Sequence, residues 1–139
     1  MKFDIAIIGG GPGGYTAAEK AAKAGLQVVL FEKEDLGGTC LNRGCMPTKA
    51  LLHSAETYSI LGKAEELGVR TYETGYDFGA MHARKDQVVE SLRQGVEKLM
   101  KSNKITVVRG HGCIAAPGIV PCDGETSEVN DIIIATGSK

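Results

Sequence analysis

The sequence predicts an α/β domain built around a mostly parallel β-sheet. A short apolar segment at residues 3–8, FDIAII, runs directly into the glycine-rich turn GGGPGG, and an alanine-rich segment follows it. A second apolar segment, LQVVLFE at residues 26–32, comes next. Strand, helix and strand in this order fit a right-handed crossover unit. Nearly continuous apolar strands are typical of parallel sheets with both faces covered.

The remaining elements are predicted from the spacing of apolar residues and from glycines that end or interrupt helices. The alanine-rich segment 13–24 predicts a helix that Gly25 ends, and residues 47–67 carry a helical pattern with a possible break near Gly62. Between residues 78 and 101, apolar residues recur at intervals of three and four positions, which predicts one long amphipathic helix. The segments expected to be strands are 3–8, 26–32, 69–73 (VRTYE), 104–110, 118–122 and 130–137.

Composition limits the class of protein. The chain has 139 residues and a net charge of −1, so we expect one domain, and no broad basic surface for nucleic acid or an anionic membrane. The start, MKFDIAIIGGGPGG, does not resemble a signal peptide, and the apolar runs are shorter than the roughly 18 residues of a membrane helix. We therefore expect a cytoplasmic protein. Four cysteines are too few for a disulfide scaffold, so a disulfide in this compartment is expected to be catalytic.

The glycine-rich turn has the pattern of a dinucleotide-binding turn. In Gly9-x-Gly11-x-x-Gly14, the first glycine permits the tight turn, the second admits a pyrophosphate, and the third lets the helix pack against the sheet. Glu32 ends the second strand, where an acid accepts hydrogen bonds from ribose hydroxyls and disfavours a 2′-phosphate. The alternative is a plain turn with a solvated glutamate. The strand, turn, helix and acid in register favour dinucleotide binding.

Two cysteines lie close together in GGTCLNRGCMPTK, and a metal site, a structural thiol pair and an opening disulfide are the candidates. In a regular helix, residues i and i+5 have Cα atoms roughly 8.5 Å apart, whereas a disulfide tolerates about 4.4 to 6.8 Å. Cys40 and Cys45 can therefore bridge only if the backbone kinks, and Gly44 is placed to allow this. Pro47 favours a helix that begins again near Cys45, where a thiol is more readily ionised. Lys49 lies one turn further on the same face.

The other two cysteines, Cys113 and Cys122, flank a Pro-Gly turn and have only His111 nearby. Zinc sites need four ligands, usually as two close pairs, so this spacing disfavours zinc. Free cysteine often behaves as a small buried apolar residue. We therefore expect both thiols to be structural or incidental.

Together, the dinucleotide turn, the ribose-binding acid and the segment GGTCLNRGCMPTKALLHSAE resemble the flavoprotein pyridine nucleotide-disulfide oxidoreductases. The resemblance covers the whole chain, because the closing IIIATGS is similar to the strand of that family that returns beside the flavin. It implies a Rossmann-like FAD/NAD(P)-binding three-layer fold and FAD as the cofactor. NAD would bind to a further domain.

The resemblance also implies roles for individual residues. Cys40 would be the thiol that exchanges with substrate, Cys45 the sulfur against the flavin, and Lys49 a neighbour of flavin N5. Arg43 departs from the family, since many relatives have valine there. The residues expected to bind FAD are Gly9, Gly11, Gly14, Glu32, Gly38, Thr39, Lys49, Gly112, Thr136, Gly137 and Ser138.

Within the family, the continuation PTKALLHS is most similar to the branch that oxidises dihydrolipoamide to lipoamide with NAD. The implied partners are dihydrolipoamide or the lipoyl domain of a 2-oxoacid dehydrogenase or glycine cleavage complex, and a second copy in a full-length homodimer. We expect residues 1–139 to form the N-terminal part of the FAD-binding domain, without the NAD-binding and dimerisation domains and without activity alone. The alternatives are another disulfide or mercuric reductase and a non-catalytic nucleotide-binding redox module.

Overall fold

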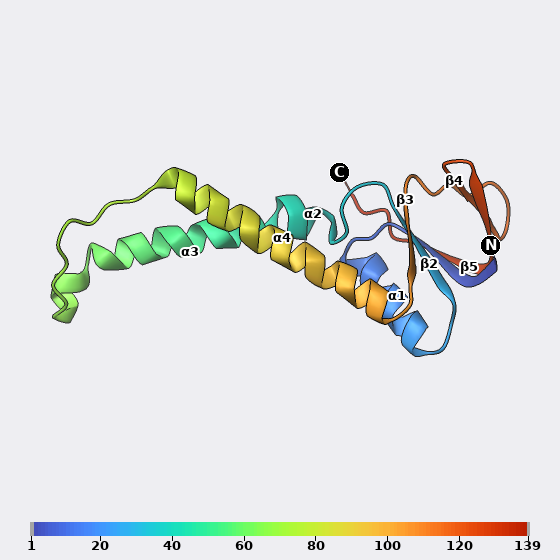
Figure 1. Ribbon diagram of the computed structural model, residues 1–139, viewed down its shortest axis with the longest axis horizontal. Coiled ribbons are helices and arrows are strands. Elements are labelled where there is room, and N and C mark those ends of the chain that lie inside the picture. The colour runs from blue at the N-terminus through green and yellow to red at the C-terminus, as the bar shows by residue number, and fades with distance from the viewer. Residues whose placement is uncertain (1, 139) are drawn as a thin grey trace.

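A five-stranded sheet lies at one end of the elongated protein in a computed structural model that describes residues 2–138 (Figure 1). Its strand order is β3-β2-β1-β5-β4. The four parallel strands β1, β2, β3 and β5 pair as neighbours, and β4 runs antiparallel to β5. The α/β class and the mostly parallel sheet are therefore confirmed. The strands are β1 Lys2–Ile8, β2 Val28–Glu32, β3 Thr106–Arg109, β4 Ile119–Cys122 and β5 Glu125–Ile134.

Helices cover one face of this sheet. Alternate side chains of a strand point to opposite faces, and Ile7 of β1 and Leu30 of β2 are fully buried beneath α1 (Pro12–Lys23) and α4 (Phe78–Ser102). Ala18 of α1 and Met100 of α4 belong to the same core. The crossover unit of strand, helix and strand is confirmed.

The other face is covered by the antiparallel hairpin of β4 and β5. Ala6 and Ile8 of β1 pack there with Phe31 of β2, and Val120 and Cys122 of β4 complete the cluster. Both faces of β1 and β2 are thus buried, which explains their continuous apolar sequences. The turn of the hairpin uses positive φ angles at Asp123 and Gly124. Consequently β5 begins at Glu125, earlier than the predicted residue 130.

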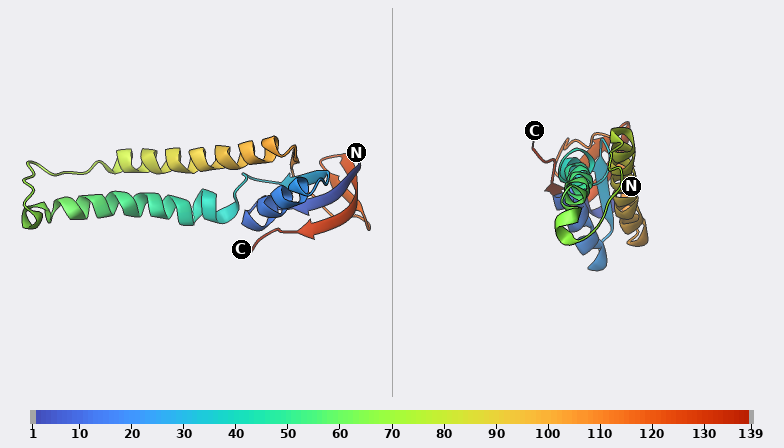
Figure 2. Two further views of the ribbon diagram at one scale, coloured as in Figure 1. Left: turned by 90° about the horizontal axis from the view of Figure 1, so that it is seen from below. Right: turned by 90° about the vertical axis from the view of Figure 1, so that its left-hand side faces the viewer.

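A helical arm extends away from the sheet (Figures 1 and 2). It consists of α3 (Cys45–Leu61) and the N-terminal half of α4, which lie side by side, and the 3₁₀ turn η1 (Ala64–Leu67) follows the break at Gly62. The prediction of a break near Gly62 is confirmed. The strand predicted at 69–73 is wrong, because these described residues cross the tip of the arm, far from any strand with which they could pair.

The helix α4 is long but amphipathic. Its 25 residues lie between the N-cap Asp77, whose side chain accepts a hydrogen bond from the Ala80 amide at 2.9 Å, and the C-cap Asn103. Val96 and Met100 lie on its buried stripe. None of the helices in the described range 2–138 is both long enough and apolar enough to cross a membrane.

Candidate cofactor and disulfide site

A groove of about 820 Å³ opens at the carboxyl ends of β1, β2 and β5. Ligands of open parallel sheets bind at such an edge. Most residues expected to bind the cofactor line it, although they come from five separate parts of the chain. These are Gly9, Gly11, Glu32, Gly38, Thr39, Gly112, Thr136, Gly137 and Ser138, and Cys40 lines it as well.

The glycines of the turn serve two purposes. A Cβ at Gly9 would lie 2.2 Å from the carbonyl oxygen of Ala135, and one at Gly14 would lie 1.8 Å from the carbonyl oxygen of Gly9. These two positions need glycine for the fold. Among the described residues, a Cβ at Gly11 would meet only the Cα of Gly38, at 3.7 Å. The protein therefore tolerates a side chain at Gly11, and what glycine preserves there is open space in the groove.

This open space fits a pyrophosphate. The first helical residue of α1 is Pro12, which has no N–H to leave unpaired, and none of the described residues in its first turn is acidic. The free N–H groups and the dipole of a 12-residue helix attract an anion at this end. Gly11 and Gly38 approach each other on the floor of the groove. The residues present thus fit the phosphate portion of a dinucleotide.

Glu32 ties the turn to the end of β2. Its Oε2 accepts a hydrogen bond from the Gly10 amide at 2.7 Å, and its Oε1 accepts one from the Glu34 amide at 2.8 Å. A carboxylate has about four acceptor sites, so two bonds leave capacity for ribose hydroxyls. The sequence predicted the ligand role of Glu32 and missed its structural role, which depends on amides that only the fold brings to it.

The segments that follow β3 and β5 also line the groove, in addition to the glycine-rich turn and the end of β2. Gly112 is buried against Phe31, and a Cβ there would lie 2.8 Å from the Phe31 Cβ. The Ala135 amide donates to the Ile8 carbonyl at 2.8 Å, which fixes the start of the Thr136–Ser138 rim. His111 also lines this rim, and sequence analysis did not predict it.

At one end of the groove, Cys40 and Cys45 form a disulfide with their Cα atoms 4.7 Å apart. The helix α2 (Gly38–Arg43) stops at Arg43, and α3 starts at Cys45. Between them, Gly44 leaves helical geometry with φ −125° and ψ −105°. A Cβ at Gly44 would lie 3.1 Å from the Thr39 carbonyl oxygen. The predicted kink at Gly44 and the new helix start at Cys45 are confirmed.

Three predicted site residues do not line the groove. Gly14 lies beneath it, packed on the turn. Cys45 is exposed and reaches the groove only through its bond to the half-buried Cys40. Lys49 is exposed one turn along α3, and its side chain makes no hydrogen bond or ion pair with residues 2–138. Their proposed contacts with the cofactor remain predictions.

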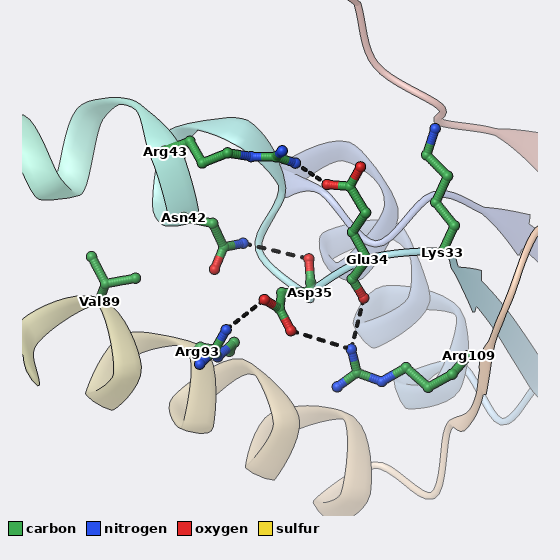
Figure 3. Close-up of a pocket in the computed structure, with 8 residues that line it drawn as sticks. All are labelled: Lys33, Glu34, Asp35, Asn42, Arg43, Val89, Arg93 and Arg109. Atoms are coloured by element: carbon green, nitrogen blue, oxygen red, sulfur yellow. Dashed lines mark hydrogen bonds and ion pairs between the residues drawn. The ribbon is translucent and has the colours of Figure 1, made fainter. Parts of the chain in front are cut away.

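The loop after β2 is held by a charged cluster in a second cavity of about 560 Å³ (Figure 3). The carboxylate of Asp35 contacts Arg93 of α4 at 2.5 Å and Arg109 of β3 at 3.6 Å. Arg109 also donates to the Glu34 carbonyl oxygen at 2.7 Å, and Arg43 pairs with the side chain of Glu34. Arg43 therefore anchors α2 to this loop beside the groove.

Arg93 of this cluster also pairs with Glu90 of α4, and their hydrogen bond shifts the pKa of both groups. A hydrogen bond from Arg93 lowers the pKa of Glu90, and that bond raises the pKa of Arg93. Both side chains are half-buried and still reach solvent, so each of these ion pairs is weak by itself. The pairs matter for the position of the loop, because Arg93 links α4 to the loop that leads into α2.

The fold and the groove define a dinucleotide-binding domain whose cofactor site ends at a disulfide. Residues 3–139 match the family described as pyridine nucleotide-disulphide oxidoreductase, and the chain belongs to this family. The resemblance seen in the sequence is thereby confirmed.

Three similar proteins share the name dihydrolipoyl dehydrogenase. The chain is 49% identical to dihydrolipoyl dehydrogenase of Chlamydia muridarum over 99% of its own length and 30% of that protein. It is 46% identical to the same enzyme of Acholeplasma laidlawii, covering 99% of the chain and 41% of the relative. With the enzyme of Bacillus subtilis, identity is 46%, over 99% of the chain and 32% of the relative. The chain thus spans less than half the length of these relatives.

Proposed function

We propose that the chain supplies the FAD site and the redox disulfide of an enzyme that oxidises dihydrolipoamide to lipoamide with NAD. One observation carries this proposal: the Cys40–Cys45 disulfide closes the end of a groove in which Gly11 leaves open space. The names of the relatives support the choice of substrate. Residues 1–139 would then be the N-terminal part of the FAD-binding domain.

In this proposal the chain binds the cofactor with groups already in place. The N-terminus of α1, with Gly9 and Gly11, receives the pyrophosphate, and Glu32 accepts from the adenosine ribose. Gly38 and Thr39 complete the phosphate region. Gly112 offers backbone to the adenine, and Thr136, Gly137 and Ser138 form the rim near the flavin. FAD is the cofactor of pyridine nucleotide-disulfide oxidoreductases, and when bound it would supply the redox chemistry that takes the electron pair from the dithiol and delivers it to NAD.

The chemistry of the chain itself is thiol exchange. A substrate thiolate attacks the Cys40 sulfur, the Cys40–Cys45 bond breaks, and Cys45 leaves as a thiolate at the N-terminus of α3. The second substrate thiol then attacks the substrate sulfur of the mixed disulfide, which releases the cyclic disulfide and the Cys40 thiol. The electron pair of the substrate now resides in the Cys40 and Cys45 dithiol. Lys49, one turn beyond Cys45, stabilises the negative charge.

The partners follow from the substrate. We propose that dihydrolipoamide reaches Cys40 either free or on the lipoyl domain of a 2-oxoacid dehydrogenase or glycine cleavage complex. We further propose a homodimer for the full-length enzyme and a cytoplasmic location.

An absorption titration tests the proposal. The protein is mixed with FAD and then with an equimolar amount of dihydrolipoamide under anaerobic conditions. We expect a new long-wavelength band from a Cys45 thiolate beside oxidised flavin, together with formation of lipoamide. The Cys45→Ser variant should lose the band, whereas Cys122→Ser should keep it. A spectrum unchanged by dihydrolipoamide, or a band that survives in Cys45→Ser, would contradict the proposal.

A further inference from the structure

A second thiol with a basic neighbour lies outside the disulfide. Cys113 is exposed, and its Sγ is 3.2 Å from Nδ1 of His111. The thiol also lies 3.7 Å from the carbonyl oxygen of His111, close enough to donate to it. An imidazole at this distance can take the proton that a thiol must lose before it acts as a nucleophile.

The backbone holds this pair in place. Gly112, between the two residues, is buried against Phe31, so the side chains on either side of it face outward together. The Cys113 amide donates to the Pro121 carbonyl at 3.1 Å, and the Gly110 amide donates to the Glu32 carbonyl at 2.9 Å. Bonds on both sides of the segment therefore hold in place the backbone that carries the thiol and the imidazole.

The other sulfur atoms are not available for the same chemistry. Cys122 is only 3% exposed, and burial raises the pKa of its thiol, which keeps it protonated. Cys40 and Cys45 are joined to each other. Of the four cysteines, Cys113 alone combines an exposed thiol with an imidazole in contact.

We propose that Cys113 is a modification site that undergoes thiol–disulfide exchange with small aliphatic disulfides, with His111 as the proton acceptor. The Cys113 sulfur attacks one sulfur of the disulfide R–S–S–R as its proton passes to His111. The S–S bond breaks, a Cys113–S–S–R mixed disulfide forms, and the departing thiolate takes the proton to become R–SH. The small disulfide is the oxidant and is reduced by the electron pair of the thiol. This site does not depend on the proposed oxidation of dihydrolipoamide.

Oxidised glutathione is a suitable probe. The 139-residue chain, with Cys40–Cys45 oxidised, is incubated with it, and adducts are counted by intact mass and located by peptide mapping. We expect one adduct, at Cys113, that is absent in Cys113→Ser and unchanged in Cys122→Ser. The reference is a synthetic peptide of residues 108–118. A Cys113 rate equal to that of the peptide, or equal labelling of Cys122, would overturn the proposal.

A second experiment tests His111 as the proton acceptor for the Cys113 thiol. In His111→Ala we expect exchange at Cys113 to slow about tenfold, which is modest for loss of a general base. Imidazole added to the solution should restore the rate of this variant while leaving the wild-type rate nearly unchanged. An adduct that forms equally fast in His111→Ala, or a slow variant that imidazole does not rescue, would rule out proton transfer to His111.

Discussion

The three glycines of the glycine-rich turn belong to one sequence motif but have different roles in the structure. Gly9 and Gly14 are required because the backbone passes too close for a Cβ, whereas Gly11 has room for one. The difference makes Gly14 a residue of the fold, whereas we propose Gly11 as a residue of the ligand site. Glu32 combines both tasks, since its carboxylate binds two backbone amides and still faces the groove.

Replacing Gly11 by alanine should separate binding from stability. Because the added Cβ would be 3.7 Å from the nearest atom, the Cα of Gly38, we expect a loss of less than about 1 kcal/mol in the free energy of unfolding. The same methyl group would occupy the proposed phosphate site, so FAD affinity should fall about tenfold or more, equivalent to about 1.4 kcal/mol. Thermal unfolding and quenching of flavin fluorescence measure the two effects. Gly14→Ala is the control and should lose about 3 kcal/mol of stability.

Removing the carboxylate of Glu32 should weaken the protein even without a ligand. In Glu32→Ala the amides of Gly10 and Glu34 lose their acceptor, and we expect the free energy of unfolding to fall by about 1 to 3 kcal/mol. Urea unfolding of the ligand-free chain measures this. Glu34→Ala removes an exposed ion pair with Arg43 and should change stability by less than about 1 kcal/mol. Equal stability of Glu32→Ala and the wild type would mean that the two bonds contribute nothing.

At the scale of elements, the disulfide depends on the interruption between two helices. The helices α2 and α3 follow each other with only Gly44 between them, and this single residue turns the chain enough to bring Cys40 and Cys45 within bonding range. The loop before α2 is anchored by Asp35 to Arg93 of α4. The position of the disulfide relative to the groove thus rests on α4 as well as on its own helices.

A methyl group at Gly44 should make the disulfide easier to reduce. Its Cβ would lie 3.1 Å from the Thr39 carbonyl oxygen and 3.3 Å from the Cys40 Cα, so the backbone must shift where the two cysteines meet. If the shift costs about 1 to 3 kcal/mol, the reduction potential rises by about 20 to 65 mV. A dithiothreitol titration with thiol alkylation measures it. Gly62→Ala, where the nearest contact is 3.4 Å, should leave the potential unchanged.

At the scale of the whole molecule, the sheet is densely packed and the arm is not. The two cores lie on the faces of the sheet. In contrast, Ala64 is the one buried residue within the described stretch 61–80 at the end of the arm. Arg84 links the two helices of the arm nearer the sheet, where it donates to the Ala50 carbonyl at 3.2 Å.

Limited proteolysis should therefore begin at the tip of the arm. Segments with few buried contacts open at low free energy, and Lys63 and Arg70 are exposed there. We expect trypsin to cut after these residues first, leaving the sheet and the disulfide region as protected pieces joined through packing. Mass spectrometry of early time points identifies the sites. First cleavage after Lys2, in β1, or after Lys23, at the end of α1, would contradict this view of the molecule.

The sequence by itself determined the first crossover unit, the dinucleotide turn and the kink between Cys40 and Cys45. These features follow from local rules: apolar runs, glycine spacing, and the fixed separation of residues along a helix. The same rules misplaced the strand at 69–73 and the start of β5, because a strand exists only where a neighbour pairs with it.

Only the tertiary structure decided which residues share the groove and what each one contacts. Gly38 faces Gly11, two amides reach Glu32, and Gly112 packs against Phe31 through contacts between segments distant in sequence. The pairing of His111 with Cys113 escaped prediction for a related reason. Both residues were visible in the sequence, but the orientation of their side chains depends on how the segment after β3 is bonded to β2 and β4. Such contacts are set by packing of the whole chain, which no local pattern encodes.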